Sequence, residues 1–131
     1  MNARVSLALA AVGQRAFAPQ PSEEQIHRAV VELLERTAVA GAFWFHVPNG
    51  EARGRGIGGK LKGMGTRAGV PDICILCAGR FYGLELKRRG GVLSPKQRLA
   101  HAQLVASGAE VRTVYSLDEA IDALRDWRVV R

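Results

Sequence analysis

Two carboxylates and a lysine stand at the ends of two neighbouring apolar runs, where their side chains could act together. Asp72 precedes the first run, and Glu85 and Lys87 close the second. Side chains alternate along a β-strand, so Glu85 and Lys87 share a face. If the two runs pair as a hairpin around residues 78–80, the start of the first lies opposite the end of the second. That pairing predicts that Asp72 lies next to Glu85 and Lys87.

This cluster is suited to metal-assisted hydrolysis of a phosphodiester. Two nearby carboxylates repel each other, and a hard cation such as Mg2+, or Mn2+ in its place, relieves the repulsion. The backbone carbonyl of Leu86 points sideways from the strand and adds a ligand. A bound cation would polarise the phosphodiester and activate water, while Lys87 orients that water or neutralises growing charge. The simpler interpretation is a solvated charge pair on a strand, with Pro71-Asp72 serving as turn chemistry.

The flanking sequence predicts the helices and strands that position these residues. A capping box begins at Ser22 and opens a helix to about residues 37–39, and Ser94 and Ser116 cap two further helices. Residues 42–47 and 110–115 read as strands, and Trp127 is expected to close the core. The predicted order is helix, strand, basic loop, strand, strand, helix, strand, helix. This order indicates a small mixed α/β sheet with helices packed on it.

Two helix starts carry further candidate residues. Glu23 lies near the core-facing stripe of the first helix and Glu24 lies toward its side, although both could simply offset the helix dipole. Gln97 is three residues after its cap, which explains it as a capping residue. His101, one turn further along the same face, is expected to be a surface histidine. His46 alternates with Trp44 in its strand and is expected to be partly buried.

The charge balance indicates a polyanionic partner. The 131 residues make one domain with a net charge of +7 and a pI near 10.3. Nucleic acid is favoured over a membrane, because no basic amphipathic helix stands out. Residues 51–69 form a glycine-rich basic stretch without a G-K-[ST] motif, so a nucleotide cofactor is not expected. We interpret it as a loop that contacts DNA and orders on binding, with a solvated linker as the alternative. The cations expected to contact DNA are Arg53, Arg55, Lys60, Lys62, Arg67, Arg88 and Arg89.

Two further features bear on location and chemistry. Cys74 and Cys77 are three apart in a predicted strand, so they face opposite sides and are read as core thiols in a reducing cytoplasm. Residues 1–21 contain a short apolar run, at 5–12, and are expected to form a tail or a short helix used in dimer packing rather than a signal peptide.

Three motifs in fixed order carry a family resemblance. They are G-V-P-D at 69–72, E-L-K at 85–87 and S-P-K-Q at 94–97. Together they resemble the VRR-NUC branch of the PD-(D/E)xK nucleases, which is similar to archaeal and phage Holliday-junction resolvases. The resemblance runs from Ser22 to about Trp127. A stand-alone unit of this size resembles the bacterial and phage members.

The resemblance implies a restriction-endonuclease-like fold, a mixed sheet flanked by helices, over residues 22–131. It implies a Mg2+-dependent DNA endonuclease in which Asp72, Glu85 and the Leu86 carbonyl hold the metal, one ion or two, and Lys87 positions water. A helix carboxylate, Glu23 with Glu24 as runner-up, and Gln97 would complete the site.

The implied substrates are branched or flapped DNA, such as four-way junctions. A homodimer in the cytoplasm of a bacterium or a phage-infected cell is also implied. Two other functions remain open: a non-catalytic basic DNA-binding module, and an RNA-directed nuclease. The second is disfavoured because no aromatic platform for stacking bases is visible.

Overall fold

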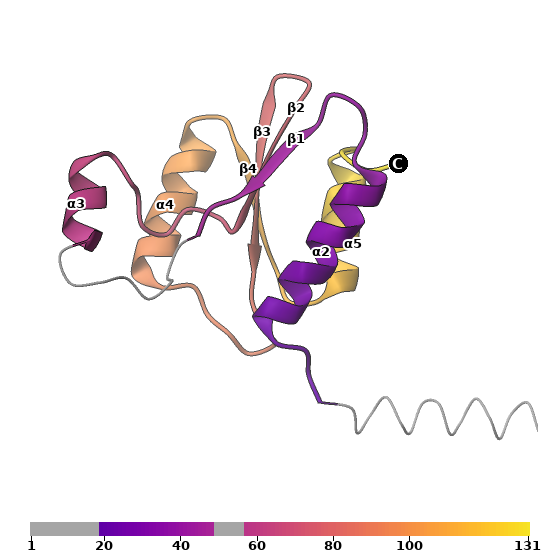
Figure 1. The fold of residues 1–131 in the computed structure, drawn as a ribbon, viewed down its shortest axis with the longest axis horizontal. Coiled ribbons are helices and arrows are strands. Elements are labelled where there is room, and N and C mark those ends of the chain that lie inside the picture. The colour runs from indigo at the N-terminus through magenta and orange to yellow at the C-terminus, as the bar shows by residue number, and fades with distance from the viewer. Residues whose placement is uncertain (1–18, 49–56) are drawn as a thin grey trace, which may run out of the picture.

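A four-stranded sheet separates helices on its two faces (Figure 1). The computed structural model describes residues 19–48 and 57–131. The strands are β1 (Phe43–His46), β2 (Ile73–Cys77), β3 (Arg80–Leu86) and β4 (Glu110–Val114). The helices are α2 (Glu23–Thr37), α3 (Ile57–Gly63), α4 (Pro95–Ala106) and α5 (Leu117–Asp126). The predicted α/β class and order of elements are confirmed, except for α3. No helix in the described ranges is long and apolar enough to cross a membrane.

The β2–β3 hairpin is the centre of the sheet. The strand order is β1-β2-β3-β4, with antiparallel pairs up to β3 and a parallel β3–β4 pair joined through α4. Ala78 and Gly79 form the two-residue turn of the hairpin, with φ values of 51° and 77°. Positive φ at both positions gives a turn whose twist matches that of the strands. Ile73 pairs with Leu84, so residue 72 lies opposite residue 85, as the sequence predicts.

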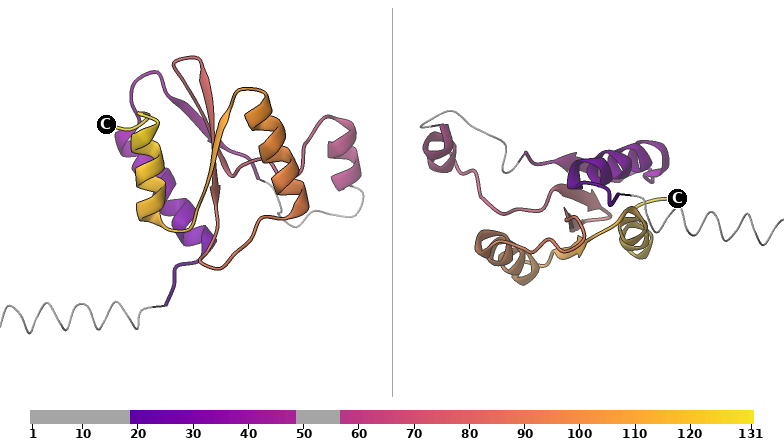
Figure 2. Two further views of the ribbon diagram at one scale, coloured as in Figure 1. Left: turned by 180° about the vertical axis from the view of Figure 1, so that it is seen from behind. Right: turned by 90° about the horizontal axis from the view of Figure 1, so that it is seen from below.

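The main hydrophobic core lies on the face of the sheet that carries α2 and α5. Figure 2 shows these two helices on one side of the sheet and α4, with α3, on the other. The predicted stripe of α2 is buried there, and Trp127 closes the core with an exposure of 6%. The buried residues of this core are Ile26, Val30, Leu34, Ile73, Ile75, Tyr82, Leu84, Leu86, Val114, Ala120, Ala123, Leu124, Trp127 and Val129.

The segment that follows α5 ties the core to the connection between α2 and β1. The Val39 amide donates to the Val129 carbonyl at 2.9 Å, and the Arg131 amide donates to the Thr37 carbonyl at 2.8 Å. Val129 is fully buried. These contacts hold the C-terminal end of α2 in place.

The helix α3 corrects the prediction for residues 51–69. The sequence I-G-G-K-L-K-G at residues 57–63 contains three glycines, each costing about 1 kcal/mol in a helix interior, and therefore predicts a loop. In the structure, half-buried Leu61 and a hydrogen bond from Arg67 to Gln103 of α4 accompany a short helix instead. Gly65, with φ of +99°, follows the helix and lets the chain turn away. Part of this segment is therefore a helix rather than a loop.

Candidate active site

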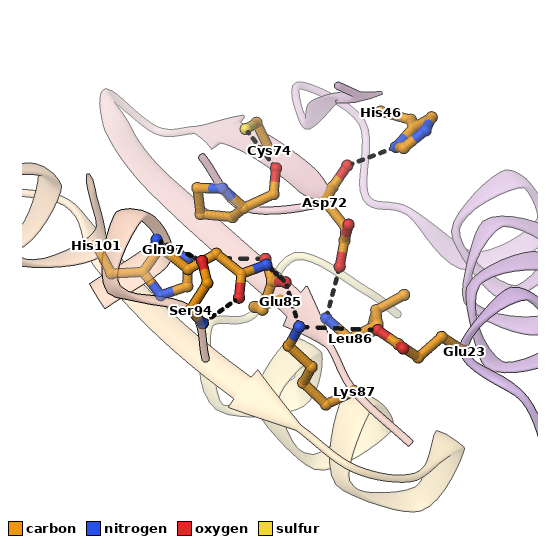
Figure 3. Close-up of polar contacts among 11 residues, drawn as sticks. Glu23, His46, Asp72, Cys74, Glu85, Leu86, Lys87, Ser94, Gln97 and His101 are labelled. Atoms are coloured by element: carbon orange, nitrogen blue, oxygen red, sulfur yellow. Dashed lines mark hydrogen bonds and ion pairs between the residues drawn. The ribbon is translucent and has the colours of Figure 1, made fainter. Parts of the chain in front are cut away.

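The predicted site residues meet at the end of the hairpin opposite its turn. The first turns of α2 and α4 lie at this end of the sheet (Figure 1). Each helix begins with a complete capping box, Ser22 with Gln25 and Ser94 with Gln97. Figure 3 shows Glu23 reaching in from α2 and Gln97 and His101 from α4, with Glu85, Leu86 and Lys87 between them.

Asp72 is held by the strand that it faces. The Leu86 amide donates a hydrogen bond to Asp72 Oδ2 at 2.8 Å. In an extended strand the amide and carbonyl of one residue point to the same side, so the Leu86 carbonyl is also directed toward the Asp72 side of β3. The main-chain carbonyl of Asp72 is bound too, by the Val47 amide at 3.1 Å and by His46 Nδ1 at 2.8 Å.

Glu85 is a buried carboxylate whose two oxygens have different surroundings. Its exposure is 1%. Oε1 accepts a hydrogen bond from Gln97 Nε2 at 2.9 Å and lies 3.9 Å from Lys87 Nζ. Oε2 is buried and has no hydrogen-bond partner in the described part of the chain. An ionised carboxylate in this position is therefore incompletely neutralised.

The surroundings of Glu85 disfavour its charged form. Burial, and after it the charge of Asp72, raise the pKa of Glu85 from the ordinary 4.5 to about 8, against the opposing charge of Lys87. Two carboxylates thus lie close enough to repel each other, beside a single lysine. A divalent cation bound between them would remove this repulsion.

Lys87 and Glu23 complete the charged cluster. Lys87 is half-buried, with a side-chain exposure of 14%, and its Nζ lies 4.0 Å from Glu23 Oε1. Glu24 instead pairs with Arg28 at 3.0 Å on the exposed side of α2. Of the two helix carboxylates considered from the sequence, Glu23 is the one that the structure brings beside Lys87.

Gln97 combines the two roles considered for it. Its Oε1 accepts from the Ser94 amide at 2.8 Å, which completes the capping box, and its Nε2 donates to Glu85. The cap fixes the side chain so that the amide nitrogen points at the carboxylate. The structural and the site assignments of Gln97 are therefore compatible.

His101 does not lie at the surface, contrary to expectation. It is 8% exposed, and its Nε2 lies 3.7 Å from Glu85 Oε2. Burial lowers its pKa. The spacing of four residues correctly placed His101 on the same face of α4 as Gln97. The apolar and polar residues of α4 are mixed around the helix, however, so the sequence does not show which face is buried. His46 also differs from expectation, because it is exposed.

Gly69 lies against the first turn of α4. A Cβ at this position would lie 2.4 Å from the Lys96 carbonyl oxygen and 2.7 Å from the Gln97 amide nitrogen. Its φ of +84° is also one that residues with side chains rarely adopt. The glycine three residues before Asp72 is thus required where the β2 lead-in packs against the helix that carries Gln97.

We expect Gly69→Ala to destabilise the protein more than Gly108→Ala, which is a matched control. Gly108 has a φ of +102°, but nothing lies within 4 Å of the place that an added methyl group would occupy, so its substitution adds backbone strain alone. That strain costs about 1–2 kcal/mol, and the clash with α4 adds to it at Gly69. Urea unfolding followed by tryptophan fluorescence measures both losses. Equal losses would contradict the close packing.

A groove of about 940 Å3 opens from the site along α2 and β1. Its acidic lining residues outnumber the arginines. The charged residues that line it are Glu23, Glu24, Glu32, Glu35, Asp72, Arg28 and Arg36. Beyond Glu23 and Asp72 of the site, Arg28 and Arg36 of this groove are paired with Glu24 and Glu32, so this part of it carries no excess of positive charge for a phosphate backbone.

The described cations that are predicted to contact DNA do not line this groove, and two further predicted cations lie outside the described residues. Lys60, Lys62 and Arg67 are exposed on and after α3, and Arg88 and Arg89 are exposed after β3. Arg53 and Arg55 lie outside the described residues, as do residues 1–18 of the predicted tail. Cys74 is buried and Cys77 is half-buried, and neither forms a disulfide.

The donor set fits a hard cation held by few protein ligands. No group of three or more His, Cys, Asp or Glu residues within residues 19–48 and 57–131 is arranged to hold a metal ion. Mg2+, however, is commonly bound through one or two carboxylates, with water completing its octahedron. Asp72, Glu85 and the Leu86 carbonyl offer oxygen atoms, and a bound cation would relieve the repulsion between the two carboxylates.

The solved structures that resemble this fold include two VRR_NUC domains. One, "VRR_NUC domain protein", matches with a TM-score of 0.69 and 22% sequence identity over 82% of this chain and 88% of its own. The other, "VRR_NUC domain", matches with a TM-score of 0.54 and 19% identity over 81% of this chain and 97% of its own. No protein-family model and no curated protein sequence matches the chain. At these identities the likeness establishes the fold.

Proposed function

We propose that this chain, whose fold is that of the VRR-NUC domain, is a metal-dependent nuclease that hydrolyses phosphodiester bonds in DNA. The observation that carries the proposal is buried Glu85, whose pKa is raised beside Asp72 and within reach of Lys87. Burying a carboxylate beside a second one destabilises the fold. Such a carboxylate at the end of a sheet, among polar side chains from two helices, is typical of a functional site. The fold makes nuclease chemistry the natural assignment.

In the proposed mechanism, Asp72 and Glu85 would hold Mg2+ or Mn2+ with the Leu86 carbonyl, and the cation would supply Lewis-acid activation of the phosphodiester and of water. Gln97 orients Glu85 through its hydrogen bond to Oε1. Lys87 positions the attacking water or offsets charge on the phosphate, and Glu23 keeps the lysine at the site.

The charge distribution suggests how DNA approaches. The acidic groove lies on the α2 side, whereas the exposed Lys60 and Lys62 lie on α3, on the other side of the sheet (Figure 2). We therefore assign DNA contacts to Lys60, Lys62 and Arg67, and to Arg88 and Arg89 just beyond the site. Phosphate contacts of this kind position a nucleic acid without reading its sequence.

The finer assignment is an endonuclease selective for branched DNA, such as flaps or four-way junctions. Cutting a junction symmetrically needs two active sites, so the proposal includes a homodimer. The cytoplasm of a bacterium or of a phage-infected cell is the compartment in which such substrates and reduced cysteines occur together.

The test is a cleavage assay on labelled linear duplex, flap and four-way-junction DNA, with Mg2+, Mn2+ or EDTA. We expect metal-dependent cleavage by the wild type and a loss of at least about a hundredfold in Asp72→Asn. The asparagine can still accept the Leu86 hydrogen bond but lacks the charge. Asp122→Asn, an exposed change on α5 of the same charge, is the control and should cleave normally.

The other outcomes distinguish the remaining functions. Tight DNA binding without product on any substrate or metal would reject the nuclease and favour a non-catalytic DNA-binding module. Preferential cleavage of RNA would keep the site and change the substrate. The ratio of junction to linear-duplex cleavage decides the branched-DNA assignment.

A further inference from the structure

Two unpartnered polar atoms face each other in the interior beside the site. Glu85 Oε2 and His101 Nε2 are both buried and both without a hydrogen-bond partner in the described part of the chain. They lie 3.7 Å apart, which is too long for a direct hydrogen bond. Buried polar atoms are nearly always paired, so two facing ones call for an explanation.

The two carboxylate oxygens of Glu85 face different neighbours. Oε1 is turned to Gln97 and Lys87, whereas Oε2 is turned to His101 in the layer between the sheet and α4 (Figure 3). A carboxylate that binds a cation through one oxygen needs a donor on its other oxygen to fix its orientation. His101 offers such a donor, because its Nε2 lies 3.7 Å from Glu85 Oε2.

We propose that His101 is a positioning residue for Glu85. In the tautomer that carries the proton on Nε2, the ring of His101 donates to Glu85 Oε2 and holds Oε1 of that carboxylate toward the cation site. The proposal rests on the metal site of the proposed function but not on the cleavage of DNA. Glu85 is ionised when it binds a cation, and its ionised Oε2 then accepts the hydrogen bond from His101 Nε2. In the proposal, this hydrogen bond closes the 3.7 Å gap between the two atoms. His101 itself contacts neither the cation nor the DNA.

The competing explanation is that His101 only fills space under α4. Its burial is compatible with such a role, and its removal would then lower stability without changing cation affinity. The two explanations are separated by measuring cation binding in the absence of DNA, beside the stability of each cation-free variant.

The experiment is calorimetric titration of the folded full chain with Mn2+, without DNA. We expect His101→Leu to weaken Mn2+ affinity by about 10–100-fold, which is the usual effect of removing a partner of a metal ligand. His101→Gln carries an amide donor of similar reach and should recover most of that loss. Leu104→Ala, a half-buried position on the same helix, controls for destabilisation alone. Circular dichroism verifies that each variant is folded during the titration.

Unchanged affinity in folded His101→Leu would overturn the proposal. Equal weakening in His101→Gln and in Leu104→Ala would also overturn it, since packing would then explain the loss. A wild type that does not bind Mn2+ removes both the metal site and this role. A wild type that binds Mn2+ with the expected variant pattern, yet cuts no DNA, supports the proposal and rejects the nuclease.

Discussion

Lys87→Met is expected to reduce DNA cleavage by about a thousandfold while leaving the fold intact. Lys87 Nζ lies 3.9 Å from Glu85 Oε1 and 4.0 Å from Glu23 Oε1. Methionine keeps most of the apolar stem that packs at the strand end, and it removes the cation that would position water. Single-turnover cleavage at saturating DNA measures the loss in the chemical step, separately from any change in DNA affinity.

Lys96→Met is the matched control for this substitution. Lys96 is exposed in the first turn of α4, next to Gln97, and its replacement removes the same charge close to the site. We expect cleavage by this variant to stay within a few fold of the wild type. Cleavage by Lys87→Met within tenfold of the wild type would exclude a direct role for the lysine in the chemical step.

Glu85→Gln is expected to stabilise the cation-free protein at alkaline pH while abolishing cleavage. The folded-state pKa of Glu85, about 8, lies above its ordinary 4.5. The native state therefore holds a proton that the unfolded state releases, so this group's contribution to stability is fully present below pH 4.5 and is lost as pH rises toward 8. At about 1.4 kcal/mol per pH unit, the loss is at most about 5 kcal/mol.

Other groups change stability over the same pH range, so the difference between the two proteins is the relevant quantity. Burial lowers the pKa values of His27 and His101. Their contribution rises as pH increases to about their ordinary 6.5, which opposes the effect of Glu85. Subtracting the unfolding free energy of the wild type from that of Glu85→Gln largely removes these terms. The difference should grow from pH 5 to about pH 8.

Mg2+ and a second variant complete this measurement. Mg2+ should raise the stability of the wild type at pH 8 and leave Glu85→Gln unchanged, because the amide cannot replace the charged ligand. Glu23→Gln removes a carboxylate with a side-chain exposure of 49% beside the same lysine, and controls for the loss of a negative charge at the site. A flat difference for Glu85→Gln across this range would mean that Glu85 is not held protonated.

The sequence was most informative where side chains that alternate along a strand are followed or preceded by a two-residue turn. The alternation around Glu85 and Lys87 and the turn at Ala78-Gly79 together set one hairpin register, and Asp72 then had only one place to lie. The capping boxes were similarly local, because each needs only a few consecutive residues. These signals were sufficient to predict the sheet, the helix starts and the position of Gln97.

The remaining features depend on contacts between distant segments. The burial of His101 follows from how α4 packs on the sheet, and its neighbours on α4 are too mixed in polarity to reveal that face. The helix α3 formed against the low helix propensity of its glycines, with the contact from Arg67 to α4 beside it. The role of Gly69 is also tertiary, because the atoms that a side chain would meet lie 27 or more positions away in sequence.

The turn at Ala78-Gly79 has a consequence for the order of folding. It makes the hairpin that carries Asp72, Glu85 and Lys87 the region of the sheet with the shortest sequence separations, and such contacts form quickly because little chain entropy is lost in closing them. We expect these three residues to come together before α2 and α4 dock. The repelling carboxylates would then meet while still exposed to water, where their repulsion is screened. We therefore expect the burial of these carboxylates to be a late step in folding.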